Sequence, residues 1–214
     1  MTKHVFPGTC RGVRRGERLT NCARVRHRQP GYNGFTLIEL VLVVGIIIVL
    51  AGLVLSTVGY ARKKGALARA ETEIAAISAA CENYKADNGV YPSNDKTNIL
   101  DARTNENPSS PSYSLTSLYL YNALFGATNG SRTPASGARS YFVFKPNMLF
   151  PPDQTQNVQY IQDPFGYSYG YSTTFQHDLD QGLQPTHGYN PTFDLWSTAG
   201  GTTTSDIPKW IKNW

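Results

Sequence analysis

GFTLIE, the stretch from Gly34 to Glu39, introduces a long apolar run that contains no charged residue before Arg62. The uncharged part extends from Leu40 to Ala61, and a helix of that length rises about 33 Å, enough to cross a hydrocarbon layer of about 30 Å. The run therefore predicts a membrane span over about residues 35–60. A carboxylate at the centre of a bilayer costs about 2.5 to 3.5 kcal/mol and less near its edge, so we expect Glu39 to have a functional partner.

The residues before this stretch are strongly basic. Residues 1–34 hold eight Lys or Arg against one acidic residue, and they have no apolar run of their own. This composition is typical of a disordered cytoplasmic leader. A secretory signal has its small cleavage-site residue after the apolar region, whereas Gly34 comes before it, so cleavage after Gly34 would leave the helix intact.

The basic leader, the Gly-Phe pair, the single Glu and the apolar run together resemble the type III signal of type IV prepilins and type II secretion pseudopilins. The resemblance implies removal of residues 1–34 by a prepilin peptidase, which cuts between Gly34 and Phe35, and N-methylation of Phe35. It also implies that Glu39 neutralises the new α-ammonium of Phe35 on a neighbouring subunit when helices pack in a filament. The alternatives are an uncleaved signal anchor and a Glu39 that only stabilises the positive end of the helix dipole, by about 0.3 to 1 kcal/mol.

The positive charge of the chain belongs to the leader. The whole sequence has a net charge of +5, of which residues 1–34 contribute +7, so residues 35–214 carry −2. We therefore expect no nucleic-acid partner. Removal of the leader also removes Cys10 and Cys22, leaving Cys81 without an intrachain partner. We expect Cys81 to be a small buried apolar residue.

Beyond Arg62 the helical pattern becomes amphipathic. Apolar residues recur at spacings of three and four, which predicts one buried stripe that consists of Leu67, Ala70, Ile74, Ile77, Cys81 and Tyr84. The other face is expected to carry Arg69, Glu71, Glu73, Glu82 and Lys85. Gly89 predicts a left-handed cap after Asn88, and Pro92 prevents the helix from resuming. The long N-terminal helix is thus expected to run from Phe35 to about Asn88, within a helical region assigned to residues 35–92.

Three glycines within the apolar run, Gly45, Gly52 and Gly59, recur every seven residues. At that spacing they share one helix face, where small residues let a second helix approach closely. The general abundance of glycine in membrane helices explains them equally well.

Residues 93–214 are expected to form a globular head. Their many Tyr, Gly, Pro, Asn, Ser and Thr residues predict short strands and ordered loops. We expect a surface loop over 93–113, a short helix over 114–125 that is capped by Ser114 with Leu115, Leu118 and Leu124 inward, and strands over 141–144, 167–171 and 192–196. The predicted fold class is α+β and pilin-like, with the long N-terminal helix packed on a small antiparallel sheet.

Four segments near the end of the chain follow the order found in the major pseudopilin of type II secretion: 163–166 (DPFG), 167–172, 193–197 (FDLWS) and 206–210 (DIPKW). The resemblance covers about residues 34–92 and 160–214, and residues 93–159 match no segment of that family. In that family a loop before the terminal Asp-Ile segment binds a structural calcium ion. The matching positions are Thr198, Ser205 and Asp206, although glycine stands where a further acidic ligand is expected and calcium prefers six to eight oxygens.

A hydrolase interpretation must also be considered. Residues 166–170 fit the G-x-S-x-G pattern around Ser168, and Asp178 and His187 follow in hydrolase order. A nucleophile elbow needs a sharp turn from a strand into a helix within a large, mostly parallel sheet, and no helical pattern follows Ser168. We therefore expect no enzyme activity, and we expect His177 and His187 to be surface residues and not zinc ligands.

The resemblance implies a structural subunit of a type II secretion pseudopilus. Such a subunit is a single-pass protein of the inner membrane, with its N-terminus in the cytoplasm and its head in the periplasm. An inner-membrane assembly platform would extract it from the lipid into a homo-oligomeric filament. The alternatives are a type IV pilin for adhesion, motility or DNA uptake and a minor subunit that binds a ligand.

Overall fold

The computed structural model describes residues 34–214, except for the side chains of Ser56 and Thr57. The predicted leader therefore lies outside the described residues, apart from Gly34. The chain divides into two units, residues 1–48 and 49–214. Along the sequence the elements are α1 (Leu37–Asn88), α2 (Pro111–Phe125), η1 (Pro146–Met148), β1 (Leu149–Phe150), β2 (Tyr160–Ile161), β3 (Gly170–Ser172), α3 (Thr174–Asp180), β4 (Asp194–Ser197), η2 (Thr204–Lys209) and β5 (Ile211–Lys212).

The long helix α1 ends where the sequence predicts. Its last residue is Asn88, and Gly89 follows with a φ of 78°, a left-handed conformation that glycine adopts without steric cost. The Gly89 N–H donates to the carbonyl of Lys85 at 2.7 Å. This bond satisfies one of the carbonyls that the end of a helix leaves without a partner.

The predicted apolar stripe of α1 is confirmed. Ala70, Ile74, Ile77 and Cys81 are buried, and Leu67 and Tyr84 pack at the edge of the same core. The expectation that Glu73 lies on the solvent face is wrong. Its side chain is only 11% exposed and accepts a hydrogen bond from the hydroxyl of Tyr169.

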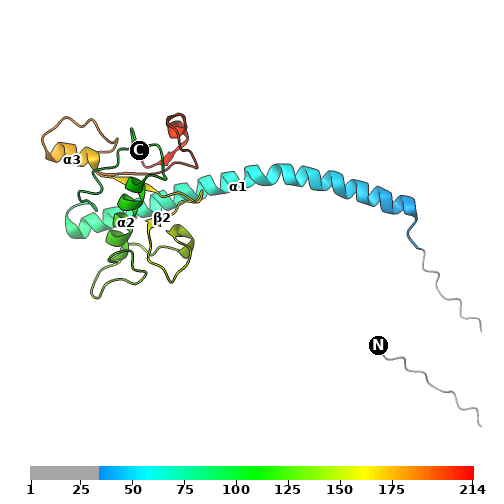
Figure 1. The fold of residues 1–214 in the computed structure, drawn as a ribbon, viewed down its shortest axis with the longest axis horizontal. Coiled ribbons are helices and arrows are strands. Elements are labelled where there is room, and N and C mark those ends of the chain that lie inside the picture. Colours follow the sequence, from blue (N-terminus) through cyan, green and yellow to red (C-terminus); the bar gives the residue numbers. More distant parts are fainter. Residues whose placement is uncertain (1–33) are drawn as a thin grey trace, which may run out of the picture. The chain divides into compact units, whose positions relative to one another are not determined.

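Two small antiparallel sheets complete the head, as the predicted α+β class requires. One sheet has the order β3-β4-β5, with Tyr171 opposite Leu195 and Ser197 opposite Ile211. The other consists of β1 and β2. Helix α2 packs against β2 and β3 (Figure 1). The main core contains residues of α1, α2 and both sheets.

The prediction of a strand over 141–144 is wrong, because this segment forms hydrogen bonds with the end of α2 instead. The N–H groups of Tyr141 and Phe142 both donate to the carbonyl of Leu124, in the last turn of α2. The ring of Phe144 lies 5.2 Å from the ring of Tyr121 on the same helix. The alternating aromatic residues of the segment 141–144 therefore cover α2 and do not pair with a strand.

The other two strand predictions hold with shifted limits. The segment 167–171 contains the start of β3, which begins only at Gly170, and Ser168 forms an isolated bridge with Gln162. The segment 192–196 overlaps β4, which begins at Asp194. Asp194 accepts hydrogen bonds from the N–H groups of Tyr189 and Asn190, so the turn that precedes the strand fixes its start.

The expectation of a surface loop over 93–113 is also wrong. The segment is largely irregular, but Leu100, Ala102 and Tyr113 are completely buried. They form a second apolar cluster with Trp196 and Trp210. The loop therefore supplies a side of the core that the small sheet would otherwise leave exposed.

The short helix exists, but it starts earlier than expected and turns a different face inward. Ser110, and not Ser114, is the N-cap, and Pro111 occupies the first turn, where its missing N–H costs nothing. Leu124 is buried as predicted, whereas Leu118 is half-buried and Leu115 is 40% exposed. The buried face consists of Tyr113, Thr116, Ser117, Leu120, Tyr121 and Leu124.

Candidate functional site

The first turn of α1 is closed by a reciprocal pair of side chains. Thr36 immediately precedes the helix, and its hydroxyl accepts the N–H of Glu39 at 3.3 Å. Glu39 Oε2 in turn accepts the N–H of Thr36 at 2.9 Å and its hydroxyl at 2.8 Å. This arrangement is a capping box, in which two backbone donors at a helix start are satisfied by side chains. The carboxylate predicted to act in assembly is thus held at the start of the helix.

The predicted cleavage site lies directly before this box. Gly34 and Phe35 precede the first helical residue, Leu37, and the side chain of Phe35 is 80% exposed. A Cβ atom added at Gly34 would meet no atom within 4 Å. The Gly34–Phe35 bond is therefore not enclosed by the described residues, while cleavage and methylation stay predictions.

The apolar part of α1 has the properties of a membrane span. Its most apolar window of 18 residues has a mean hydropathy of 3.1, and none of that window is buried. Within residues 34–214, this is the one helix long and apolar enough to cross a bilayer. Large apolar side chains such as Leu40, Ile47 and Leu55 are exposed. This fits a single-pass anchor, since exposed apolar side chains are favourable in contact with lipid tails and unfavourable in contact with water.

Two of the residues matched to calcium ligands, Thr198 and Asp206, line one small cavity in the connection between β4 and β5. The cavity has a volume of about 200 Å³, and it is also lined by Lys63 and Lys209. Asp206 Oδ1 lies 2.9 Å from the ammonium of Lys209, and Asp206 Oδ2 accepts the hydroxyl of Thr203 at 2.7 Å. These two bonds lower the pKa of Asp206 to about 2.

These residues do not fit a calcium ion as they are arranged. Calcium prefers several carboxylates among six to eight oxygens, whereas Asp206 is the one carboxylate that lines this cavity and two lysines line it too. The third matched residue, Ser205, is exposed and bonds to Thr203. Within residues 34–214, no three His, Cys, Asp or Glu side chains gather as a metal-binding group.

The Asp163-Pro164-Phe165-Gly166 segment forms a turn, with Gly166 at a φ of 92°. Asp163 Oδ1 accepts the N–H groups of Phe165 and Tyr167, both at 2.9 Å. Its Oδ2 accepts the hydroxyl of Ser197, the last residue of β4. Burial raises the pKa of Asp163. The residue is therefore structural and attaches the turn to the sheet.

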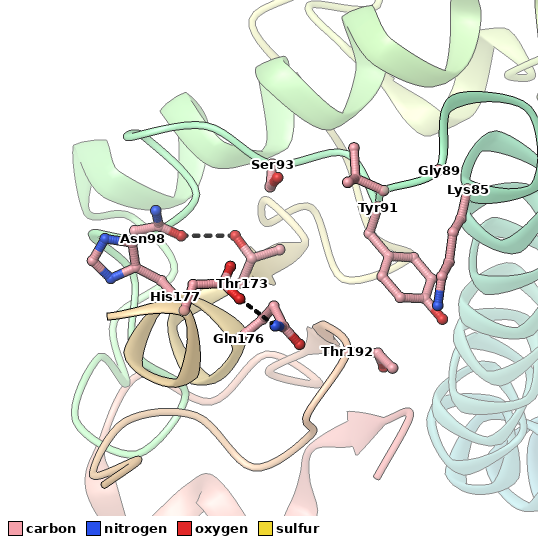
Figure 2. Close-up of a pocket in the computed structure, with 11 residues that line it drawn as sticks. Lys85, Gly89, Tyr91, Ser93, Asn98, Thr173, Gln176, His177 and Thr192 are labelled. Carbon is pink, nitrogen blue, oxygen red and sulfur yellow. Dashed lines mark hydrogen bonds between the residues drawn. The ribbon is translucent and has the colours of Figure 1, made fainter. Parts of the chain in front are cut away.

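Two cavities of the head meet at Asn98 and His177. One, of about 330 Å³, is lined by residues from the end of α1, the segment after it and α3. Figure 2 shows Asn98 and His177 at one end of this cavity and Tyr91 beside Lys85 at the other, with Gln176 between them. The hydroxyl of Thr173 donates to Asn98 Oδ1 at 2.8 Å.

The second cavity, of about 410 Å³, continues from Asn98 and His177 toward Asp101, Asp178 and His187. Most lining side chains of both cavities carry uncharged hydrogen-bonding groups. Such a lining suits a hydroxylated ligand better than an apolar one.

The three residues of the hydrolase pattern do not come together. His187 Nδ1 does lie 2.9 Å from Asp178 Oδ2. The hydroxyl of Ser168, however, is buried and donates to the carbonyls of Tyr113 and Tyr169. It does not line the cavity that contains His187. The Asp178–His187 pair thus lies apart from Ser168, and both His177 and His187 are exposed, as expected.

Sequence reasoning missed two features of these regions. The capping box has a recognisable sequence signal, because Thr36 stands three residues before Glu39 at the start of an apolar run. The paired cavities have no such signal, since they depend on the return of α3 beside the segment that follows α1. Only the folded structure brings Asn98 next to Thr173.

No family model matches the sequence. No solved structure matches it either. Among curated proteins, the chain is similar to the type II secretion system core protein G of Pectobacterium carotovorum subsp. carotovorum. The two are 35% identical over 77 residues, which is 35% of this chain and 49% of the relative, so the chain matches about half the length of that protein. This similarity confirms the resemblance to the pseudopilins, and to their major member, that the sequence motifs indicate.

Proposed function

We propose that this chain is a structural subunit of a type II secretion pseudopilus and that its role is assembly and not catalysis. The observation that carries the proposal is the position of Glu39. It is the one acidic residue in the apolar part of α1, and within the described residues its hydrogen bonds go to Thr36. A carboxylate at this position in lipid needs a cation that its own helix does not offer before processing.

Removal of the leader would supply that cation. Cleavage between Gly34 and Phe35 by a prepilin peptidase gives Phe35 a free α-ammonium, which is then N-methylated. The capping box holds the Glu39 carboxylate at the same end of the helix. When two mature helices lie side by side with an axial offset, the carboxylate of one reaches the ammonium of the other. Because unpaired charges in a low dielectric are costly, this pairing favours one stagger over others.

The rest of α1 supports the same role. Its exposed apolar side chains suit lipid in the stored subunit and helix contacts in a fibre. A Cβ added at Gly45, Gly52 or Gly59 would meet no atom within 4 Å, so these small residues are open to the close approach of a second helix. We therefore propose a homo-oligomeric filament as the product. Its subunits would be stored in the inner membrane with the head in the periplasm, and a secretion assembly platform would extract them.

The test is to express the full chain with a prepilin peptidase and a type II secretion assembly platform, and to compare it with Glu39→Val. We expect both proteins to enter the membrane and to lose residues 1–34, which N-terminal mass spectrometry reports together with methylation of Phe35. Only the parent protein should form fibres that can be sheared from cells. Leu42→Val, a substitution within the same apolar run, is the matched control and should assemble normally.

Two results would contradict the proposal. One is a normal fibre yield from Glu39→Val, and the other is retention of the basic leader while the peptidase is active. Loss of motility or DNA uptake, with secretion intact, on deletion of the gene would favour the type IV pilin alternative instead.

A ligand-binding minor subunit is the second candidate, and the paired cavities at Asn98 and His177 favour it. The hydroxyl and amide side chains that line them suit an oligosaccharide. Calorimetric titration of the full chain with a series of cello- and chito-oligosaccharides tests this candidate. Binding that is lost in Asn98→Ala would support it, and the absence of heat with every sugar would contradict it.

A further inference from the structure

We propose that the ammonium of Lys209 occupies the position that the pseudopilin resemblance assigns to a calcium ion, so that the loop between β4 and β5 needs no metal. The inference concerns residues 198–209 alone and does not depend on the proposed assembly function. It rests on three observations: the partners of Asp206, the space around Gly201, and the bonds that order the loop.

Both oxygens of the Asp206 carboxylate already have partners. Oδ1 faces the Lys209 ammonium at 2.9 Å, and Oδ2 accepts the Thr203 hydroxyl. Lys63, from α1, lines the same cavity as Lys209. Two cations and one carboxylate give the cavity a net positive charge, which repels a divalent cation. The charge that calcium would supply to Asp206 is therefore provided by a side chain.

Position 201 has no room for a second acidic ligand. A Cβ atom added at Gly201 would lie 2.4 Å from the Cβ of Asp206 and 3.1 Å from the carbonyl oxygen of Thr198. The Gly201 N–H donates to that same Thr198 carbonyl at 2.8 Å. Glycine at this position is thus required by close packing against Asp206, because the Asp206 side chain and the Thr198 carbonyl fill the place where a ligand side chain would enter.

The order that a metal would give this loop comes from the chain itself. The loop leaves the sheet at Ser197 and returns at Ile211, which is directly opposite Ser197 in the register. Trp196 and Trp210 directly precede these two residues, and their stacked rings have centroids 5.8 Å apart. Between them the N–H of Asp206 donates to the carbonyl of Thr203 at 2.9 Å. The sheet and the stacked rings hold both ends, so the loop has little to gain from a bound ion.

The Lys209 ammonium neutralises the charge of the Asp206 carboxylate, but this ion pair contributes little to the free energy of unfolding. The Lys209 side chain is 71% exposed, and solvent and salt weaken an ion pair at such a site. Removal of the pair should therefore change the melting temperature very little. What it should change is the response of the loop to calcium.

The test measures thermal unfolding of the full chain in detergent micelles by circular dichroism, with millimolar calcium and with a chelator. A resident calcium ion present at about 100 times its dissociation constant would raise the midpoint by roughly 5 to 10 °C. We expect no difference between the two conditions for the parent protein. Lys209→Glu, which places a second carboxylate beside Asp206, should acquire a calcium-dependent rise.

Lys212→Glu is the matched control, because it makes the same change of charge on β5 at a residue that lies over the rings of Tyr189 and Trp214 and not beside Asp206. It should stay insensitive to calcium. A calcium-dependent rise in the parent protein would overturn the whole inference. No response in Lys209→Glu, or an equal response in Lys212→Glu, would overturn the placement of the ammonium at the ion position.

Discussion

The hydroxyl of Tyr169 donates a hydrogen bond to Glu73 Oε2 at 2.8 Å, joining the residue before β3 to the amphipathic part of α1. Tyr169 is completely buried. Burial, and then the nearby Glu73 carboxylate, raise the pKa of this phenol well above its usual range, so it stays a donor at physiological pH. Glu73 Oε1 accepts Arg69 Nε at 2.6 Å, so both carboxylate oxygens are used.

Tyr169→Phe should destabilise the head without changing its fold. It removes one hydrogen bond to a charged acceptor in a largely buried place, a loss of about 1.5 to 3 kcal/mol in the free energy of unfolding. Urea unfolding followed by circular dichroism measures the change. Tyr167→Phe is the control, since the Tyr167 hydroxyl makes no hydrogen bond within the described residues, and it should be nearly neutral. Equal stability of the two variants would show that the Tyr169–Glu73 bond contributes nothing.

Gly170→Ala should be among the more damaging single substitutions in β3. An added Cβ would lie 2.2 Å from Trp196 Cε2, and a buried indole ring on the facing strand cannot move away without repacking. Overpacking of this kind costs about 1 to 3 kcal/mol or more. Gly65→Ala is the contrasting variant, because its Cβ would meet nothing within 4 Å in α1. It should stabilise the helix by up to about 1 kcal/mol. Thermal unfolding of both variants in detergent checks the two signs, and a harmless Gly170→Ala would contradict the packing argument.

The stability of the head should fall as the pH rises from about 4 to about 6. Burial raises the pKa of Asp194 to about 6, and the neighbouring Asp101 acts in the same direction, while Arg103 and two backbone N–H groups oppose it. In the unfolded chain the pKa of an aspartate is about 3.9. A raised pKa in the folded state contributes stability that is complete below the unfolded value and is lost as the pH passes the folded one.

Asp194→Asn tests this pH dependence. The Asn side chain should lower stability at every pH, because its NH₂ group cannot accept an N–H and so only one of the Tyr189 and Asn190 N–H groups keeps its acceptor. It should, however, remove the loss of stability between pH 4 and 6 that Asp194 causes. Burial also raises the pKa of Asp163, so the difference between parent and variant, and not the parent curve alone, isolates Asp194. Parallel curves from urea unfolding at several pH values would contradict the assignment.

Cys81 should be protected from thiol reagents in the folded protein. Its side chain is completely buried in the stripe of α1, and burial raises the pKa of its thiol far above the usual range. The thiolate is the reactive form, so both exclusion and protonation slow the reaction. In a variant that carries Cys10→Ser and Cys22→Ser, maleimide labelling should be slow in buffer and fast in denaturant. Rapid labelling of the folded chain would show that this face of α1 is open.

The long helix could be predicted closely, whereas the head could be predicted only in outline. A stripe at spacings of three and four and a glycine cap are local signals. They predicted the burial of Ala70, Ile74, Ile77 and Cys81 and the end of α1 at Asn88. The alternating aromatic residues at 141–144 also formed a local signal, and it was misleading. Their N–H groups donate to a carbonyl at the end of α2, and no periodicity in the sequence indicates this long-range interaction.

The candidate site could also be predicted only in part. The position of Glu39 could be predicted because it depends on a few adjacent residues and on the apolar run. The calcium expectation came from aligned positions, and those positions do not specify that Lys209 reaches back three residues to Asp206 or that the Gly201 backbone packs against it. Such contacts depend on how the loop closes, which the order of residues alone does not determine.

All three tryptophans of the chain lie in one cluster beside β4 and β5. Trp196 stacks on Trp210 and meets Trp214 edge-on at 5.9 Å. The tryptophan fluorescence of the protein therefore originates at its C-terminal end, and none of it originates in the apolar part of α1. Emission spectra would follow the docking of the last strand as a local event, so a shift in wavelength that precedes the loss of helical signal would mark fraying of this end before the head melts.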